Sequence, residues 1–439
     1  MIENKEINRT FEKYPEYKDS GVEWLGEIPS HWEVKKMKFL GSIFPGLSGK
    51  KGDDFSKEFK ADFKPFIPFT NICNNLKINA DQYQYVHIGE FEVQNKVRKN
   101  DILFLMSSET LEDIGKCSLY NGENKELYLN SFCKGFRFFS NKLSTYFVNY
   151  LLHGQIYRNY FSLVGRGFTR INLKQEYIND APIVLPLLPE QTTIATFLDD
   201  KTSKIDTAIA QKEKMIALLK ERKQIIIQNA VTKGLDPNAK MKDSGVEWIG
   251  EIPEGWEILP GLRFIAESRE RNIGMKRDTV LSLSYGNIRI KQKEELTGLV
   301  PESFETYQLV NKGDIIFRPT DLQNDKVSLR SSISNYKGII TSAYLNLRVK
   351  DIALPKYYHY LFRAIDNNKV IYGLGSGLRQ NISFQDFRRF DFPFPSLNEQ
   401  IAIANYLDNK STKIDQAISL QQTQIEKLKE YKATLIEGR

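Results

Sequence analysis

The chain contains one sequence frame twice. Residues 18–33 read KDSGVEWLGEIPSHWE and residues 242–257 read KDSGVEWIGEIPEGWE, so thirteen of the sixteen positions match at an offset of 224. A second pair, residues 188–227 and 397–436, matches at 19 of 40 positions at an offset of 209. The segments between these anchors hardly resemble each other. Because a repeat requires two copies of one structure, the sequence predicts one scaffold that carries two divergent inserts.

Net charge separates the inserts from the repeated frame. Residues 34–187 carry +6 and residues 258–396 carry +7, whereas residues 1–33, 188–257 and 397–439 carry −4, −2 and 0. Two separate basic bodies indicate a polyanionic partner such as nucleic acid. An ordinary basic surface without such a partner is the alternative reading.

Length and cysteine usage set further bounds. A chain of 439 residues is expected to fold as two or more domains. No leader and no apolar run that could span a bilayer is evident, so we expect a cytoplasmic protein. Cys73, Cys117 and Cys133 form no CxxC pair, which argues against a disulfide framework or structural zinc. No metal site is predicted, because the four histidines lie far apart in the sequence: His31, His87, His153 and His359.

The second pair of repeated segments predicts long helices. In the first copy, residues 190–198 predict a short amphipathic helix, and the charged residues 199–201 interrupt it. Thr202 or Ser203 is expected to cap a new helix that runs to about Val231.

Apolar residues of both copies follow a heptad pattern with alternating spacings of four and three. One polar residue stands at the matching position of each copy, Lys212 and Gln421. This spacing is typical of a coiled-coil seam and predicts that the two helices pair directly; packing on two separate globular cores is the alternative. The predicted seam residues are Ile205, Ile209, Ile216, Leu219, Ile226, Ile414, Ile418, Ile425, Leu428 and Leu435.

Each insert predicts a mixed α/β domain with many short strands, which gives the whole chain the α+β fold class. Residues 64–72 and 279–288 are strand-like, and residues 97–104 match residues 310–317 as a turn into a buried strand. Further matches indicate that the two inserts share a fold while their loops have diverged. These matches pair residues 115–119 with 325–329, 146–151 with 357–361 as helices, and 170–172 with 379–381.

In combination, three elements of the chain resemble the specificity subunits of type I restriction-modification enzymes. They are the SGVEWLGEIP entry to each insert, the P-x-x-EQ-x-x-IA-x-x-L-D start of the first helical segment, and the late R-x-N element. Two departures stand out: Asn398 replaces the proline in the second copy, and the second copy stops at Arg439. Its last residues, IEGR, resemble a protease-recognition linker, so a native and a truncated end are both open.

The resemblance implies the domain plan. The two helical regions pair antiparallel as a pseudo-two-fold repeat and set the distance between two DNA readers. The expected order is an N-terminal arm (1–17), target-recognition domain 1 (18–187), helical region 1 (188–241), target-recognition domain 2 (242–396) and helical region 2 (397–439).

The resemblance also implies the partners. The subunit binds double-stranded DNA and docks two modification subunits and, for cleavage, translocating restriction subunits. S-adenosylmethionine, ATP and Mg²⁺ are expected in those partners, and no cofactor is expected in this chain. Because the two inserts differ, the expected DNA target is bipartite and asymmetric. Its bases and its spacer length cannot be read from the sequence.

A stand-alone methyltransferase or nuclease is the alternative function. Residues 373–377 (GLGSG) imitate a loop that binds S-adenosylmethionine, but residues 391–394 (DFPF) do not match the D/N-P-P-Y/F motif. Asp113, Glu123 and Lys125 imitate a D…ExK nuclease triad, but without strand context solvated loop charges are the favoured explanation. No P-loop of the GxxxxGK[ST] type occurs, so no catalytic residue is predicted.

The residues that contact DNA are expected in loops of the two inserts. Arginine and lysine are the commonest partners of guanine in the major groove, and asparagine or glutamine those of adenine. Half to two-thirds of such contacts reach only phosphate and sugar. Arg170 and Arg379 have a structural alternative, because both inserts retain them. The candidates are Lys50, Lys51, Lys116, Arg166 and Arg170 in the first insert, and Arg318, Gln323, Lys326, Arg330 and Arg379 in the second.

A direct assay separates the two functions. We expect the purified chain alone neither to methylate DNA in the presence of S-adenosylmethionine nor to cut DNA in the presence of Mg²⁺, because it lacks a complete motif for either reaction. The measurement is incorporation of labelled methyl groups and gel analysis of the DNA. Methylation or cutting by the lone chain would overturn the prediction.

Overall fold

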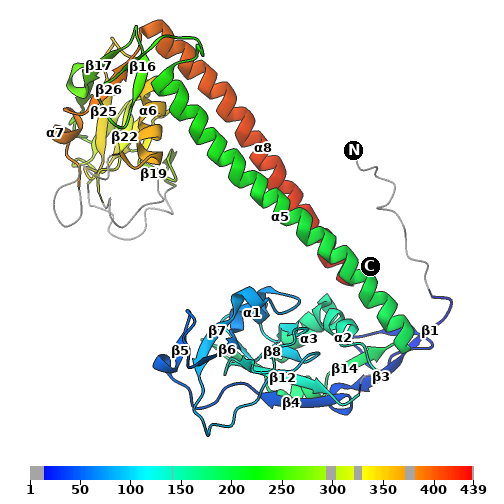
Figure 1. The fold of residues 1–439 in the computed structure, drawn as a ribbon. Coiled ribbons are helices and arrows are strands. Elements are labelled where there is room, and N and C mark those ends of the chain that lie inside the picture. The colour runs from blue at the N-terminus through cyan, green and yellow to red at the C-terminus, as the bar shows by residue number, and fades with distance from the viewer. Residues whose placement is uncertain (1–13, 141, 293–302, 321–328, 371–380, 438–439) are drawn as a thin grey trace. The chain divides into compact units, whose positions relative to one another are not determined.

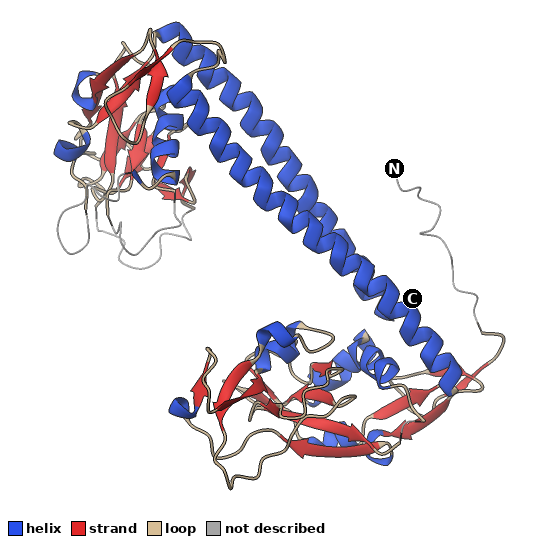
Figure 2. Cartoon of the chain, viewed as in Figure 1, coloured by secondary structure: helices blue, strands red, loops and turns tan. Residues whose placement is uncertain are grey.

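The chain folds as two compact units. The computed structural model describes residues 14–140, 142–292, 303–320, 329–370 and 381–437. The first unit comprises residues 1–210 and 424–439, and the second comprises residues 211–423. Figure 1 labels the elements along the chain, and Figure 2 shows that helices and strands occur in both units. The predicted α+β class is confirmed.

An antiparallel sheet of four strands, in the order β10-β8-β12-β4, forms the centre of the first unit. The central strand β8 is buried on both faces. Its Ile102 and Phe104 pack with helices α2 and α3, while Leu103 and Leu105 pack in a second cluster with Leu129. Burial on both faces explains why this strand reads as a continuous apolar run. The elements are β4 (Gly41–Pro45), β8 (Ile102–Leu105), β10 (Cys117–Leu119), β12 (Cys133–Phe138), α2 (Thr145–His153) and α3 (Gln155–Val164).

A second sheet of the first unit has the order β11-β6-β7-β5. The predicted strand over residues 64–72 is only half right, because β6 ends at Ile67 and helix α1 follows. Pro68 stands at the N-cap of α1 and has no N–H to continue a strand ladder. The elements are β5 (Phe55–Ser56), β6 (Phe63–Ile67), α1 (Phe69–Asn74), β7 (Gln84–His87) and β11 (Tyr128–Leu129).

The central sheet of the second unit repeats that of the first. Its order is β23-β22-β25-β18, and each strand corresponds in chain order to β10, β8, β12 and β4. Helix α6 takes the place of α2, so the prediction that the inserts share a fold is confirmed for their centres. The elements are β18 (Ile265–Glu267), β22 (Ile315–Phe317), β23 (Ser331–Ile333), β25 (Leu345–Val349) and α6 (Pro355–Asn367).

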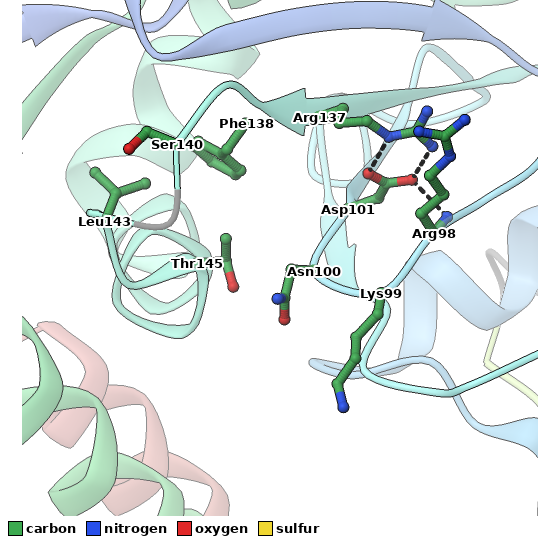
Figure 3. A pocket seen from close by; sticks show the side chains of 9 residues that line it. All are labelled: Arg98, Lys99, Asn100, Asp101, Arg137, Phe138, Ser140, Leu143 and Thr145. Carbon is green, nitrogen blue, oxygen red and sulfur yellow. Dashed lines mark hydrogen bonds and ion pairs between the residues drawn. The ribbon is translucent and has the colours of Figure 1, made fainter.

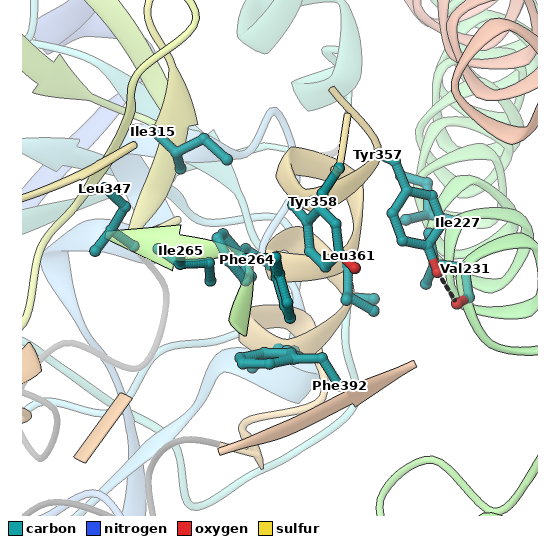
Figure 4. Close-up of a cluster of buried hydrophobic side chains, with 14 of the residues drawn as sticks. Ile227, Val231, Phe264, Ile265, Ile315, Leu347, Tyr357, Tyr358, Leu361 and Phe392 are labelled. Atoms are coloured by element: carbon teal, nitrogen blue, oxygen red, sulfur yellow. Dashed lines mark hydrogen bonds between the residues drawn. The ribbon is translucent and has the colours of Figure 1, made fainter. Parts of the chain in front are cut away.

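Aromatic side chains fill the core of the second unit. Tyr357 and Tyr358 of α6 are fully buried and pack in one cluster with Phe264 and Phe392. Figure 4 shows the Tyr357 hydroxyl donating to the carbonyl of Val231, at 2.8 Å. This contact ties the insert to the end of the long helix α5.

The inserts differ outside their central sheets. The predicted strand over residues 279–288 is a hairpin, because Tyr285 and Gly286 adopt φ angles of 47° and 73° and reverse the chain. Two separate two-stranded sheets here replace the second four-stranded sheet of the first unit. The strands are β19 (Leu281–Ser284), β20 (Asn287–Ile290), β21 (Gln308–Val310) and β24 (Gly338–Ile340).

The repeated frame closes each insert. The strand that enters an insert pairs antiparallel with the strand that leaves it, β3 with β14 and β17 with β26. The repeated SGVEW segment forms the hairpin before each entry. The frame strands are β1 (Tyr17–Asp19), β2 (Glu27–Pro29), β3 (Glu33–Lys36), β14 (Pro182–Leu185), β15 (Met241–Asp243), β16 (Glu251–Pro253), β17 (Glu257–Pro260) and β26 (Asp391–Phe394). The remaining elements are η1 (Met37–Phe39), η2 (Gly52–Asp54), η3 (Ala80–Gln82), β9 (Ser107–Ser108), β13 (Ile171–Asn172), α4 (Gln175–Asn179), η4 (Gly261–Arg263) and α7 (Phe384–Phe387).

Helix α5 (Leu188–Lys233) is continuous, so the predicted interruption at residues 199–201 and the cap at Thr202 are wrong. Asp199 does not break the helix, because its carboxylate accepts a hydrogen bond from Tyr150, at 2.6 Å. Asp200 forms an ion pair with Lys204 one turn later, at 2.8 Å. The Thr202 hydroxyl donates to the carbonyl of Leu198 inside the helix, at 2.7 Å. Each polar side chain is satisfied without ending the helix.

Helix α8 (Leu397–Glu437) pairs with α5 through the predicted seam. All ten predicted seam side chains are buried or half-buried, whereas most flanking positions are exposed. Figure 2 shows the two helices side by side. The heptad prediction is confirmed. Among the helices that the structure describes, none combines the length and apolar character that a membrane crossing requires.

Polar contacts fix the antiparallel register of the pair. The ammonium group of Lys212 donates to the amide oxygen of Gln421, its equivalent at the offset of 209, at 3.3 Å. One ion pair occurs twice at the same offset. Lys223 contacts Asp415 and Lys432 contacts Asp206, each at 2.7 Å. A polar residue in an apolar seam favours one register over others, and here it faces its own repeat copy.

The repeated glutamate and glutamine join each helix to its insert. Gln191 is 3% exposed; its amide NH₂ donates to the carbonyl of Pro186, at 2.7 Å, and its oxygen accepts from the N–H of Ser144, at 2.9 Å. Ser144 is the N-cap of α2. Glu190 accepts from the indole N–H of Trp32, at 3.1 Å.

The second copy repeats these bonds. Gln400 is fully buried and bridges the Pro395 carbonyl and the N–H of Leu354, at 2.9 Å and 2.8 Å. Leu354 is the N-cap of α6. Glu399 accepts from the indole N–H of Trp256, at 2.9 Å. The Glu-Gln pair of the sequence motif therefore has a structural role, because it joins each long helix to its insert.

Removing one of these amides should destabilise the fold. Gln400→Ala leaves a buried N–H and a buried C=O without partners, so we expect the free energy of unfolding to fall by about 1–3 kcal/mol. Urea denaturation followed by circular dichroism measures the change. Gln422→Ala is the matched control, because Gln422 is exposed on the same helix. Equal stability of the two variants would contradict the assigned role of Gln400.

Candidate nucleic-acid interface

Three of the predicted DNA contacts of the first insert lie around one hollow of the first unit. The hollow measures about 250 Å³, and Arg170, Asp113 and Cys73 belong to its lining. Lys116 reaches it through an ion pair with Asp113, at 2.6 Å. Arg166 belongs to the same loop as Arg170. The structure thus brings together residues that are up to 54 positions apart in the sequence.

The loop between α3 and β13 presents Arg170 on a fixed backbone. Two backbone hydrogen bonds join Arg166 and Asn172 across the loop, at 3.1 Å and 2.8 Å. The side-chain NH₂ of Asn172 donates to the carbonyl of Arg170, at 3.2 Å. A Cβ atom at Gly167 would lie 2.0 Å from that same carbonyl oxygen, and Gly167 has a φ of +150°. The R-x-N element and the glycine therefore set the shape of this loop.

The Arg170 guanidinium lies over the ring of Phe132, with its carbon 4.8 Å from the ring centroid. Phe132 is held in a turn before β12: its N–H donates to the side chain of Asn130, at 2.9 Å, and its carbonyl accepts from Met106, at 3.0 Å. A cation–π contact with a fixed ring restricts the positions that the guanidinium can take. Arg170 is exposed to solvent, so its donors can reach a ligand.

The charged groups of Arg166 and Lys116, unlike that of Arg170, already have partners. Arg166 directs its guanidinium back to the carbonyls of Leu163 and Gly165. Lys116 is engaged with Asp113 and with the sulfur of Cys73. Of the three predicted residues around the hollow, Arg170 is therefore the one whose charged group makes no ion pair or hydrogen bond to a described residue.

Lys50 and Lys51 are neighbours with different surroundings. The Lys50 side chain is only 8% exposed and forms an ion pair with Glu92. Hydrogen bonds from Lys50, Gln94 and the backbone of Gly89 lower the pKa of Glu92 to about 2, so the pair stays charged at neutral pH. Lys51 is exposed. The Lys50 ammonium group is held against a carboxylate, which disfavours a DNA contact, and that contact stays a prediction.

Arg330 differs from the exposed candidates, because its side chain is fully buried. The guanidinium donates to the carbonyl of Thr320, at 2.5 Å, and the backbone N–H donates to Asp366, at 2.6 Å. These bonds favour a structural role for Arg330, and its predicted DNA contact stays a prediction. Arg318 is half-buried beside it. Gln323, Lys326 and Arg379 lie outside the described residues.

Another hollow, with a polar lining, lies near the start of β8, and Figure 3 shows the side chains that line it. Asp101 lies at its centre and accepts from the Arg137 guanidinium, at 2.7 Å and 2.9 Å, and from the N–H of Arg98, at 2.7 Å. Burial raises the pKa of Asp101, and the bonds from Arg137 and Arg98 oppose that rise. Asp314 and Arg348 repeat the ion pair in the second unit, at 3.2 Å. The duplication indicates a structural turn.

Where the structure describes them, the imitations of catalytic motifs do not form sites. Asp113 pairs with Lys116, and Glu123 pairs with Lys99. Residues 391–394 form the frame strand β26, whose Phe392 is fully buried and unable to bind a target base. The glycine-rich residues 373–377 lie outside the described residues.

Buried histidines and cysteines belong to the cores. Burial lowers the pKa of His153 to about 4 and that of His359 to about 3. Cys117 and Cys133 are buried free thiols whose pKa burial raises. Within the described ranges, no group of three or more His, Cys, Asp or Glu side chains is arranged to hold a metal ion.

Two aromatic residues of this surface escaped the sequence analysis. Phe132 is half-exposed under Arg170, and Phe168 is fully exposed in the loop that carries Arg170. Phe168 stands between Gly167 and Thr169 in the sequence GRGFTR, and single exposed apolar residues are common on protein surfaces, so the sequence gave no specific signal for it. Phe132 gave none either, since only the tertiary fold places it beside Arg170.

A duplicated α+β unit with basic inserts on paired helices is the architecture of a two-part DNA reader. The model of the type I restriction modification DNA specificity domain matches residues 29–216 and 278–430. The chain belongs to this family, and its function is DNA specificity.

Curated relatives and a solved structure agree with this assignment. A putative type I restriction enzyme MjaX specificity subunit from Methanocaldococcus jannaschii is 26% identical over 428 residues, covering 94% of this chain and 93% of the relative. The type I restriction enzyme EcoKI specificity subunit of Escherichia coli is 27% identical over 207 residues, covering 47% and 44% of the two chains. A chain from a structural study of type I R-M assembly and conformational transition has the same fold, with a TM-score of 0.66, 12% identity, and coverage of 93% and 97%.

Lys51 should contribute to the salt dependence of DNA binding. An exposed lysine that contacts a phosphate adds about 0.9 to the slope of log affinity against log salt. We expect Lys51→Ala to lower that slope by about this amount. Lys50→Ala, the matched control, should leave the slope unchanged, because Glu92 already neutralises Lys50. Fluorescence anisotropy between about 50 and 200 mM salt measures both. Equal slopes for Lys51→Ala and the unaltered protein would remove Lys51 from the interface.

Proposed function

We propose that this chain selects the DNA target of a type I restriction-modification complex by reading two different half-sites. Residues 18–187 and 242–396 are the two target-recognition domains, and residues 188–241 and 397–439 are the helical regions that join them. The target is therefore bipartite and asymmetric. The observation that carries the proposal is the duplicated frame with divergent inserts.

The contacts of the frame support this division of labour. The bonds of Glu190, Gln191, Glu399 and Gln400 recur in both copies with nearly the same lengths. The central sheets also recur in the same order, while the second sheet of the first unit has no equivalent of four strands in the described part of the second. Selection for constant contacts within the frame leaves the outer surfaces of the inserts free to differ. Two different surfaces on two copies of one fold suit two different base sequences.

The chemistry is assigned to other subunits. We propose that this chain is non-catalytic and works in the cytoplasm with two modification subunits and with restriction subunits, which supply S-adenosylmethionine, ATP and Mg²⁺ chemistry. The alternative of a stand-alone methyltransferase or nuclease is not favoured, because the described parts of the imitated motifs form ion pairs and the frame strand β26.

Exchange of one insert tests the proposal. Replacing residues 34–187 with the corresponding insert of another family member should change one half of the preferred DNA site and leave the other half unchanged, because each insert has its own core. Selection of binding sites from a random pool of duplex DNA, followed by sequencing, measures both halves.

The reciprocal chimera is the control. Replacing residues 258–396 should change the opposite half of the site. An exchange that alters both halves would show that the two inserts do not read DNA independently. A chain that selects no preferred sequence at all would refute the DNA-reading role itself.

A further inference from the structure

The loop of residues 165–172 carries more than one property of a base-reading element. Its backbone is fixed by the pairing of Arg166 with Asn172 and by the close approach that Gly167 allows. It exposes Phe168 completely and presents Arg170 stacked on Phe132. A single exposed apolar side chain is ordinary for a protein surface, but the fixed backbone of this loop holds Phe168 and Arg170 together on one surface where a ligand can reach both.

We propose that Arg170 and Phe168 form the base-reading pair of the first target-recognition domain, with Arg170 donating to a guanine and Phe168 packing against the methyl group of a neighbouring thymine in the major groove. This inference rests on the proposed function and names the bases that its first reader selects. The guanine presents two acceptors, O6 and N7, which match two N–H groups of one guanidinium, and the thymine presents an apolar methyl group in the same groove.

The geometry of Arg170 favours a base over a phosphate. A phosphate accepts hydrogen bonds from many directions, whereas the two acceptors of guanine require a guanidinium held in one plane. The ring of Phe132 lies under the guanidinium and restricts its position, and the turn of Asn130 and Met106 holds Phe132 in place. A phosphate contact would gain little from this arrangement.

The hollow beside Arg170 adds polar groups to the same surface. The hydroxyl oxygen of Ser107 is buried and has no hydrogen-bond partner, and Ser107, Ser108 and Thr110 all line the hollow with Arg170. The strand that carries the serines, β9, pairs with β13 directly after Arg170. Thr110 is exposed, and its hydroxyl can donate to or accept from a base edge, so this surface can extend the contact that Arg170 begins.

Arg98 provides a matched control. It lies in the same insert and is exposed like Arg170. It belongs to the structural turn around Asp101, where its backbone N–H donates to the carboxylate. Removing Arg98 changes the charge by the same amount as removing Arg170 without touching the proposed reader.

The test measures base preference with the full-length chain and a random pool of duplex DNA. Arg170→Ala should lower discrimination for guanine at one position of one half-site by roughly 5- to 150-fold, the range for one bidentate contact. Arg170→Lys should lose the same preference while keeping the charge. Phe168→Ala should weaken the preference for thymine beside that position, and Arg98→Ala should leave the preferred sequence unchanged. Circular dichroism should show the same folded content in every variant.

Three outcomes overturn the inference. An unchanged preferred sequence in Arg170→Ala would show that Arg170 reads no base. A uniform loss of affinity for all sequences, with a smaller salt slope, would make Arg170 a phosphate contact. A guanine preference that Arg170→Lys retains in full would show that the guanidinium held by Phe132 is not the feature that selects the base, because a lysine can also donate to guanine. Failure of the unaltered chain to select any sequence is distinct, because it refutes the proposed function and not only this pair.

Discussion

The buried glutamine at the start of each long helix is the contact on which the architecture depends. Gln191 and Gln400 each satisfy a backbone carbonyl before the helix and the N–H of the cap of a helix within the insert. A glutamine carries both a donor and an acceptor, so one side chain fixes two chain segments. Without it, both buried backbone groups would lose their partners. The direction in which α5 or α8 leaves its insert is set at this point.

The two long helices pair through a seam in which residues of one repeat copy contact the equivalent residues of the other. Lys212 faces Gln421, and the ion pairs of Lys223 with Asp415 and of Lys432 with Asp206 are equivalent. Exposed ion pairs contribute little stability, about 0–1 kcal/mol each. Their value here is register, because a slip would place a lysine against an apolar seam position. The frame thus has a defined geometry that is independent of the loops that differ between inserts.

The tertiary structure separates candidate DNA-contacting residues that the sequence could not tell apart. The sequence predicted a contact surface from charge, and charge alone did not separate Lys51 from Lys50 or Arg170 from Arg330. Lys50 and Arg330 are held by Glu92 and Thr320, partners that are 42 and ten positions away in the sequence. The wrong prediction of a helix boundary has a similar cause. Asp199 was expected to interrupt the helix, but the folded chain places the hydroxyl of Tyr150 against its carboxylate.

The sequence by itself determined the duplication, the α+β class, the seam and the family resemblance, because each of these is encoded by periodicity or by repeated residues along the chain. The tertiary structure decided which basic residues are available for DNA. Exposure and stacking depend on residues brought together from distant segments, as Phe132 is brought under Arg170. Periodicity records which face of an element is buried, whereas the partner of a single side chain on a loop is decided only when the chain has folded.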